Sequence, residues 1–292
     1  MNDRHNHTQA TAARKFAVTV VSPPGYLHAA AFTEVAESIH YGLIELGYDS
    51  LLTASGNLPG RQHIVLGANL LPHYPLPLAP DAILYNLEQV QVGSSWFRPE
   101  LLDLYRRHRV WDYSPLNAAA LAAVGITVEQ VVPVGYVPGL TRIAPAPVRD
   151  IDCLFIGSLN PRRQEILERI SNTGLQVQAA VGIYGAERDA LIARSKLLLN
   201  VHFYEAKVLE IVRISYLLAN RCAVLSERGA DPAEDNSLAG GVAFAGYNQL
   251  AERACELIAD TAERETLAQL GFELMSSRPA ADYLWAALAG IL

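Results

Sequence analysis

Short apolar runs alternate with longer amphipathic segments along almost the whole chain, and this alternation limits the possible folds more than any other feature. The runs have the length of strands that are buried on both faces. The segments between them have the periodicity of helices that bury one side. Because strands that alternate with helices in this way form βαβ units, we predict an α/β fold built on parallel sheets.

The expected elements fall into two sets, each large enough to make a sheet of its own. In the first half we expect strands at 16–21, 49–53, 63–66, 82–86, 109–113 and 130–133 and helices at 28–46, 99–107 and 115–124. In the second half we expect strands at 151–157, 175–180, 196–200 and 222–227. Helices are expected from residue 161, at 187–194, between residues 200 and 222, and through most of the stretch after residue 247.

The chain length and a proline-rich connection divide these sets into two domains. Single cores stop growing at about 250–300 residues, so a chain of 292 residues favours two cores. Prolines at 133, 138, 145 and 147 interrupt the periodicity and stiffen an extended connection. We therefore expect a disordered tail at 1–14, an N-terminal Rossmann-like domain at 15–135, a linker at 136–150, and a C-terminal Rossmann-like domain with C-terminal helices at 151–292.

Net charge, cysteine content and hydropathy limit the kinds of binding partner and the cellular compartment that we expect. A net charge of −7 argues against a broad surface for nucleic acid or anionic membranes, while a local basic pocket for phosphate remains compatible with it. The three cysteines form no CxxC pair, and Cys153 and Cys222 sit in apolar runs, which favours a reducing cytoplasm. No apolar run approaches the roughly 20 residues that a transmembrane helix needs. The oligomeric state stays open.

The loop after the first strand of the second half carries the first candidate site residues. In a doubly wound sheet, ligands bind beyond the carboxyl ends of the strands, where helix N-termini favour anions. The loop reads GSLNPRR at 157–163, in which Gly157 allows a close backbone approach and Asn160 suits an N-cap. Arg162 and Arg163 then place two cations where the helix dipole disfavours them, which points to an anion such as a diphosphate. The alternative is two solvated arginines on a surface helix.

The second group of candidates follows the strand KLLLN, at 196–200. Lys207, Glu210 and Arg213 recur every third residue, and with Glu205 we expect them in the first half of the next helix. A surface ladder of ion pairs, worth a few tenths of a kcal/mol per pair, is the plain alternative. Their position between two buried strands favours a ligand site, since carboxylates can hold ribose hydroxyls and cations can hold phosphate. His202 falls at the same edge.

Three stretches resemble a known enzyme group: FIGSLNPRR, YGAERDALIARSKLLLNVHFYE and EIVRISYLLANRCAVLSE. They are similar to the nucleotide-sugar half of GT-B glycosyltransferases, especially bacterial family 1-like and CgeB-like groups, over about residues 155–230. The first half, with PPGY and YNLEQ, is compatible with the acceptor domain of that fold. The resemblance implies two Rossmann-like domains facing a cleft, a nucleoside-diphosphate sugar on the second domain and an unknown acceptor on the first. It implies these donor-binding candidates: Gly157, Ser158, Arg162, Arg163, His202, Glu205, Lys207, Glu210 and Arg213.

The chain departs from the family pattern at the ribose-binding carboxylate. The part of this chain that aligns with that glutamate motif reads YLLANRCA at 216–223 and contains no glutamate, so Glu205, Glu210 or Glu227 must take the role. The text Asp150-Ile151-Asp152 spells the DxD metal motif of a different glycosyltransferase fold, but it precedes its strand instead of following one. We therefore predict no metal and no cofactor apart from the donor substrate.

Two residues of the first half are candidates for the catalytic base that an inverting transferase requires. His28 lies in GYLHAAAF, and Glu88 ends the stretch ILYNLE. His28 is equally compatible with a plain position at a helix N-terminus. A retaining transferase would need no such base, and the residues do not choose between the two outcomes.

The sequence therefore predicts a cytoplasmic, metal-independent hexosyltransferase, with two alternatives. One is a non-catalytic GT-B-like module that binds a nucleotide or a partner protein, and the other is a sugar-nucleotide epimerase. The chain contains no GxSxG, HExxH or GxxxxGK[ST] motif and no GxGxxG after its first strand. Hydrolase, metalloprotease, P-loop and dinucleotide-binding functions of those types lack their motifs.

Overall fold

The computed structural model describes residues 14–91 and 97–290. The chain forms two compact units, one of Met1–Val137 with Arg278–Leu292 and one of Pro138–Ser277. The C-terminal segment from Arg278 therefore belongs to the first unit, which corrects the expected domain at 151–292. The expected tail at 1–14 lies, apart from Arg14, outside the described residues.

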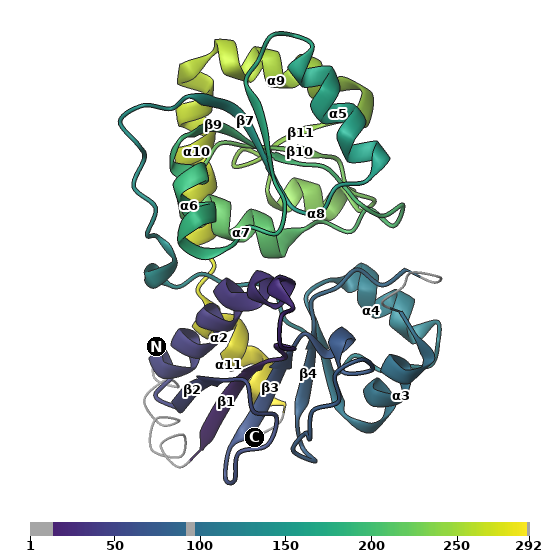
Figure 1. The fold of residues 1–292 in the computed structure, drawn as a ribbon. Helices are drawn as coiled ribbons and strands as arrows, with labels where there is room; N and C mark the ends of the chain where they lie inside the picture. The colour runs from purple at the N-terminus through teal and green to yellow at the C-terminus, as the bar shows by residue number, and fades with distance from the viewer. Residues whose placement is uncertain (1–13, 92–96, 291–292) are drawn as a thin grey trace. The chain divides into compact units, whose positions relative to one another are not determined.

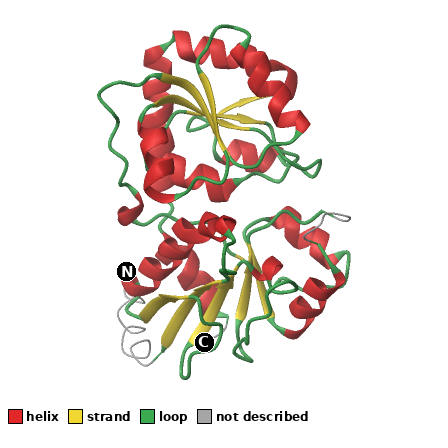
Figure 2. Ribbon diagram, viewed as in Figure 1, coloured by secondary structure: helices red, strands yellow, loops and turns green. Residues whose placement is uncertain are grey.

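The first unit contains a six-stranded parallel sheet in the order β2-β1-β3-β4-β5-β6 (Figures 1 and 2). Its strands are β1 (Lys15–Val20), β2 (Asp49–Thr53), β3 (Gln62–Leu66), β4 (Ile83–Asn86), β5 (Arg109–Asp112) and β6 (Gln130–Val131). Its helices are η1 (Leu27–Phe32), α2 (Thr33–Glu45), η2 (Ala68–Leu70), α3 (Pro99–Arg107), α4 (Pro115–Ala122) and α11 (Ala280–Ala289). Strand β3 is buried along its whole length, including the polar residues Gln62 and His63 at its start.

Helix α11 packs on α2 and is fixed to the first unit by backbone pairing. Tyr136 N donates to Arg278 O at 2.8 Å, and Ala280 N donates to Tyr136 O at 2.9 Å. Two glycines allow the close approach: a Cβ at Gly135 would lie 2.4 Å from Ala280 Cα, and one at Gly42 would lie 2.8 Å from Leu284 Cδ1. The apolar C-terminal sequence is thus part of the first core.

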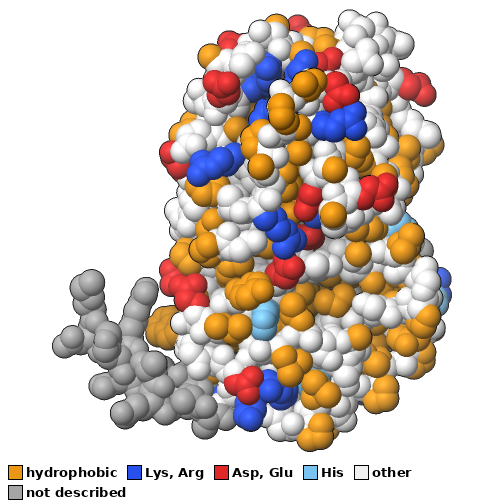
Figure 3. All heavy atoms as spheres, turned by 60° about the vertical axis from the view of Figure 1, so that its left-hand side comes forward, with side chains coloured by type: hydrophobic (Ala, Val, Ile, Leu, Met, Phe, Trp, Pro, Cys, Tyr) orange, Lys and Arg blue, Asp and Glu red, His pale blue; other side chains and the backbone are white. Residues whose placement is uncertain are grey.

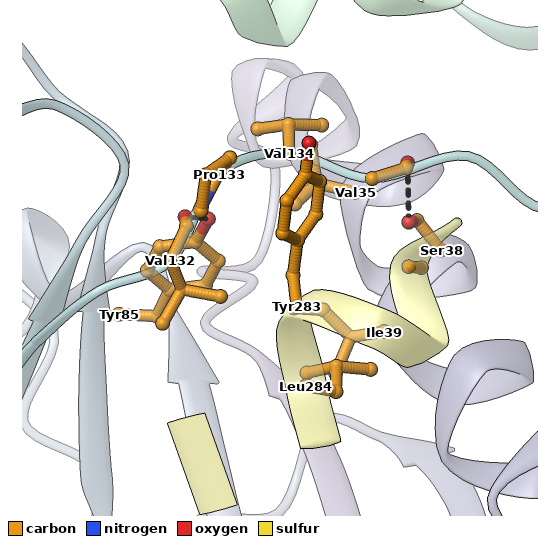
Figure 4. Close-up of a pocket in the computed structure, with 11 residues that line it drawn as sticks. Val35, Ser38, Ile39, Tyr85, Val132, Pro133, Val134, Tyr283 and Leu284 are labelled. Carbon is orange, nitrogen blue, oxygen red and sulfur yellow. Dashed lines mark hydrogen bonds between the residues drawn. The ribbon is translucent and has the colours of Figure 1, made fainter. Parts of the chain in front are cut away.

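A small cavity of about 10 Å³ remains beside this junction, with room for about one water molecule. Figure 4 shows it with Tyr283 and Leu284 of α11 among the residues that line it. The Ser38 hydroxyl donates to the Gly135 carbonyl at 2.7 Å. The junction is therefore closely packed, and the cavity is too small for an organic ligand.

The second unit contains a five-stranded parallel sheet in the order β11-β10-β9-β7-β8. Its strands are β7 (Ile151–Ile156), β8 (Val177–Ala180), β9 (Ser195–Asn200), β10 (Val224–Glu227) and β11 (Ala243–Ala245). Its helices are η3 (Pro138–Leu140), α5 (Pro161–Ser171), α6 (Gly185–Ala193), α7 (Ile211–Ala219), α8 (Pro232–Ser237), η4 (Tyr247–Gln249), α9 (Leu250–Ala259) and α10 (Thr261–Ser276). Cys153 is fully buried in β7, as expected for a thiol that acts as a small apolar group.

Candidate functional site

The candidate donor residues of the second unit gather where its strand order reverses. Strand β7 has β8 on one side and β9 on the other. The crossover from β7 to β8 and the next one, from β8 to β9, therefore run in opposite directions across the sheet. This switch point is the usual ligand position in open parallel sheets. Gly157 follows β7, Asn200 ends β9 and Glu227 ends β10, which brings polar groups from three strands to one edge.

Arg162, in the first turn of α5, is held by the buried carboxylate of Glu227. Arg162 Nη1 donates to Glu227 Oε2 at 2.6 Å and to the His202 carbonyl at 3.0 Å, and its Nη2 also donates to Glu227. Lys207 Nζ lies 3.2 Å from Glu227 Oε1. The Arg162 and Lys207 side chains are 29% and 40% exposed, so both cations keep access to a ligand.

Arg163, the next residue, is instead a buried structural cation. Its Nε donates to Val201 O at 2.8 Å and its Nη1 donates to Ser158 O at 2.7 Å. The guanidinium stacks between the rings of Phe155 and Phe203, at 5.0 and 5.1 Å from their centroids. Burial lowers the pKa of Arg163 to about 9, with a further contribution from the positive charge of Arg213. Arg163 therefore joins the two loops and adds positive charge, while being too enclosed to contact a ligand itself.

Arg213, in the first turn of α7, reaches the loop after β7. Its Nη1 donates to Asn200 Oδ1 at 2.7 Å. Gly157 has a φ of 140°, which favours glycine, and a Cβ at this position would lie 2.8 Å from Arg213 Nη2. The Gly157 backbone therefore lies close to this guanidinium, while its expected close approach to a ligand stays a prediction.

Glu210 and His202 form the centre of the cluster. His202 is fully buried, and its Nδ1 lies 2.9 Å from Glu210 Oε2. Asn200 Nδ2 donates to the same carboxylate at 2.9 Å, and Arg163 Nη2 donates to Glu210 Oε1 at 3.5 Å. Burial alone would raise the pKa of Glu210, but His202, Arg213 and Asn200 together lower it to about 2. Glu210 is therefore a carboxylate at neutral pH.

The cluster carries an excess of positive charge. Four cations, Arg162, Arg163, Lys207 and Arg213, face the two carboxylates Glu210 and Glu227, which leaves two positive charges in excess before His202 and the neighbouring Glu234 are counted. Side chains of both signs are scattered in small groups over the face shown in Figure 3, so the cations there do not form one continuous stripe. The excess is local, as the overall charge of −7 requires.

The expected helical stripe is wrong. Helix α7 begins at Ile211, so Glu205, Lys207 and Glu210 lie in the loop after β9, and only Arg213 is in the helix. Lys207 has a φ of 45°, which a helix does not allow. The buried hydrogen bonds of Glu210 override the helical preference of this stretch, and they also exclude the surface ladder of ion pairs.

Glu205 and Ser158 do not join the cluster through their side chains, while Glu227, expected only as a possible ribose ligand, and the unexpected Asn200 and Ser226 do. Glu205 is exposed and forms no ion pair with the described members, while Ser158 contributes its carbonyl. Asn200 and Ser226 are fully buried and hydrogen-bonded to each other at 3.0 Å, and Glu227 is the carboxylate that holds Arg162 and Lys207. The sequence feature that marks Asn200, Ser226 and Glu227 is a polar residue at the carboxyl end of a mostly apolar strand.

In the first unit, Glu88 and His28 both follow carboxyl ends of strands. Glu88 comes two residues after β4, and burial raises its pKa from 4.5 to about 7. His28 is exposed on η1, with its ring centroid 5.3 Å from that of Tyr26. Burial, and then the charge of Glu88, raises the pKa of Tyr26. Tyr26 is therefore near both base candidates, and Glu88 has the pKa that suits proton transfer at neutral pH.

No protein-family model matches the chain. Among curated proteins it resembles two uncharacterized proteins of Acanthamoeba polyphaga mimivirus. L138 is 32% identical over 113 residues, which are 38% of this chain and 13% of that protein. L140 is 25% identical over 181 residues, which are 59% of this chain and 55% of that protein. The chain thus matches only part of the length of either relative.

Solved structures match over nearly the whole chain at low identity. HepE (Alr3699) of Anabaena in complex with UDP and glucose has a TM-score of 0.61 at 13% identity, covering 94% of this chain and 99% of that one. WaaG, a glycosyltransferase involved in lipopolysaccharide biosynthesis, has a TM-score of 0.59 at 12% identity over 94% and 98%. AviGT4, a glycosyltransferase involved in avilamycin A biosynthesis, has one of 0.57 at 15% identity over 95% and 98%. The chain has the GT-B glycosyltransferase fold. The expected fold of two Rossmann-like α/β units is therefore confirmed.

The DxD motif of this GT-B chain lies far from the cluster. Asp150 and Asp152 are at the amino end of β7, opposite the edge that carries Gly157. Asp150 is paired with Arg194 at 2.5 Å and Asp152 with Lys196 at 2.7 Å. Both carboxylates are thus engaged in structural ion pairs. Among the described residues of the GT-B chain, no helix is both long and apolar enough to cross a bilayer.

Proposed function

We propose that the protein is a glycosyltransferase that moves a hexosyl group from a nucleoside-diphosphate sugar to an acceptor hydroxyl without a metal ion. The observation that carries this proposal is the excess of positive charge at the switch point of the second unit, which suits a diphosphate. The GT-B fold and the UDP and glucose bound in the HepE structure support the same ligand class.

Lys207 and Arg162 are the cations that would contact the diphosphate, because they are the more exposed members of the cluster. Arg163 and Arg213 would act from behind, where partial or full burial strengthens their field at the site. Positive side chains that face a leaving diphosphate stabilise the charge that develops on it. This arrangement supports metal independence, since the side chains supply the charge that a divalent ion would otherwise supply.

In the reaction, the acceptor oxygen forms a bond to the anomeric carbon while the bond from that carbon to the diphosphate oxygen breaks. The diphosphate leaves with the bonding electron pair, and the acceptor proton passes to the Glu88 carboxylate. With Glu88 as base the transfer inverts the anomeric centre. Glu210 is proposed to replace the missing ribose carboxylate, because it lies in the cluster and keeps 12% of its side chain exposed, whereas Glu227 is 1% exposed.

The test combines binding with turnover. Thermal unfolding is measured with UDP, GDP and dTDP, and the matching sugar nucleotides are then assayed for release of the diphosphate. We expect one nucleotide to raise the unfolding temperature and its glucose conjugate to turn over, with a ligand at about 100 times its Kd adding roughly 2.7 kcal/mol of stability. If no nucleotide stabilises the protein, the proposal fails.

A binding module is a second candidate because Arg162 and Lys207 are both paired with a carboxylate of the protein. Stabilisation by one nucleotide, without diphosphate release from any sugar conjugate, would favour that function. Conversion of the sugar nucleotide into an isomer, without an acceptor, would instead indicate the epimerase.

A further inference from the structure

A buried polar network lies directly beneath Glu88 in the first unit. It consists of the last residues of β4 and β5 together with side chains of α3 and α4: Asn86, Asp112, Tyr105 and Asn117. Asp112 and Asn117 are fully buried, and Asn86 and Tyr105 are nearly so. Buried polar groups cost free energy unless they are hydrogen-bonded, and a buried network whose members are hydrogen-bonded makes the local structure rigid.

The two amides form a bracket between the Asp112 carboxylate and the backbone of Glu88. Asn86 Nδ2 donates to Asp112 Oδ2 at 2.6 Å and to Glu88 O at 2.9 Å. Asn117 Nδ2 donates to Asp112 Oδ1 at 3.1 Å and to the same Glu88 carbonyl at 2.9 Å. Both amides therefore donate to the same two partners, the Asp112 carboxylate and the Glu88 carbonyl.

The amide oxygens hold the N–H groups of the same segment. Asn86 Oδ1 accepts from Glu88 N at 3.3 Å and from the Tyr105 hydroxyl at 3.0 Å. Asn117 Oδ1 accepts from Val90 N at 2.9 Å. Side chains of β4 and α4 thus fix the backbone at residues 88–90.

Asp112 anchors the bracket. Its Oδ1 also accepts from Ser114 N at 2.8 Å, so hydrogen-bond donors surround its carboxylate. Burial raises the pKa of Asp112 to about 7, while Asn86, Ser114 and Asn117 oppose that rise. Asp112→Asn would place a side-chain N–H group where the carboxylate now accepts from the N–H groups of Asn86 and Asn117, so hydrogen bonds of the bracket would be lost.

We propose that Asn117 and Asp112 are positioning residues for Glu88, holding the backbone of residues 88–90 so that the Glu88 carboxyl stays where it receives the acceptor proton. This inference rests on the proposed transferase function and on Glu88 as its base. It gives the buried amides and Asp112 a part in the reaction without contact to the substrate. The charge of Glu88 also raises the pKa values of Tyr26 and Tyr105. For Tyr26 the larger cause is burial, and for Tyr105 the larger causes are burial and the charge of Asp112.

The first test is an NMR titration of the Glu88 side-chain carboxyl carbon, assigned by its loss in Glu88→Gln. In the wild-type protein we expect a midpoint near 7. In Asn117→Ala, residues 88–90 should be released, which should hydrate the Glu88 carboxyl and move its titration midpoint toward 4.5. If that variant does not fold, the isosteric Asp112→Asn takes its place. Thr19→Val is the matched control, since it removes a buried hydroxyl of the same unit that donates to Ser55 O.

The second test is a double-mutant cycle on turnover. If Asn117 acts through Glu88, the variant with both Glu88→Gln and Asn117→Ala should be no slower than Glu88→Gln alone. A Glu88 midpoint that stays near 7 in Asn117→Ala and Asp112→Asn, or rate losses that multiply in the double variant, overturns this inference. The proposed function fails separately, on the absence of nucleotide binding and of sugar transfer in the wild-type protein.

Discussion

The guanidinium of Arg162 and the carboxylate of Glu227 form a two-pronged ion pair that joins the first turn of α5 to the last residue of β10. Glu227 is 1% exposed, whereas Arg162 is 29% exposed. Burial alone would raise the pKa of Glu227, yet Arg162 and the neighbouring charges lower it. A buried carboxylate thus orients a cation whose remaining surface is open to a ligand.

Arg162→Ala should weaken binding of the nucleoside diphosphate that stabilises the wild-type protein about tenfold to a hundredfold, the range that corresponds to one charged hydrogen bond of roughly 1.5–3 kcal/mol. The measurement is isothermal titration calorimetry at fixed salt. Arg194→Ala is the control, because it removes an equal charge from the opposite edge of the same sheet, where Arg194 pairs with Asp150. Equal losses in both variants would mean that Arg162 acts only through the overall charge.

Glu88→Gln should lower the turnover of the sugar donor by about two to four orders of magnitude and leave nucleotide affinity unchanged. A base must be ionised to take a proton, so wild-type turnover should rise with pH and level off above about pH 7, where burial places the pKa of Glu88. The rate is measured from pH 5.5 to 9 in steps of about half a pH unit. Turnover that is unchanged in the variant would remove Glu88 from the mechanism.

Glu210 should make the second unit sensitive to acid. Its pKa is about 2 in the folded protein against an ordinary value of 4.5, so its contribution to stability is complete above pH 4.5 and is lost as the pH falls toward 2. The contribution is on the order of 3 kcal/mol. Urea unfolding between these limits should show a steeper loss of stability for the wild-type protein than for Glu210→Gln. Parallel curves would contradict the ion-pair assignment.

Gly135→Ala should destabilise the first unit by roughly 1–3 kcal/mol, because the added methyl group would overlap the backbone of α11. Gly139→Ala is the matched control, since nothing lies within 4 Å of a Cβ at that position. Thermal unfolding compares the two. If both variants unfold together, α11 is not packed on Gly135 as described.

Local signals predicted much of the fold. The expected strand at 49–53 is β2 and the expected helix at 99–107 is α3, because proline, glycine and the change of periodicity mark their ends. The Asn160 cap is also confirmed, since its Oδ1 accepts from Arg163 N at 2.9 Å. Parallel strands bring their carboxyl ends to one edge, so loop order alone was enough to gather Arg162, His202 and Arg213.

Contacts between specific side chains, which no periodic pattern reveals, account for the features that the sequence did not predict. The stretch from Glu205 to Glu210 has helical spacing, but Asn200 and His202 hold Glu210 outside α7, and Lys207 takes a left-handed conformation. The bracket around Glu88 joins residues up to 29 positions apart, which no local pattern encodes. The partner of the C-terminal helix was missed for the same reason, since apolar periodicity shows that a face is buried without showing against what.

The return of α11 to the first unit determines the order in which the molecule can be completed during synthesis. All of Pro138–Ser277 leaves the ribosome before Ala280–Ala289 does, so the second unit has its full set of strands and helices first. Until then α2 exposes the apolar face that Leu284 later covers. The first unit is thus completed after Pro138–Ser277, and a nascent chain stalled before residue 278 should depend on chaperones at α2.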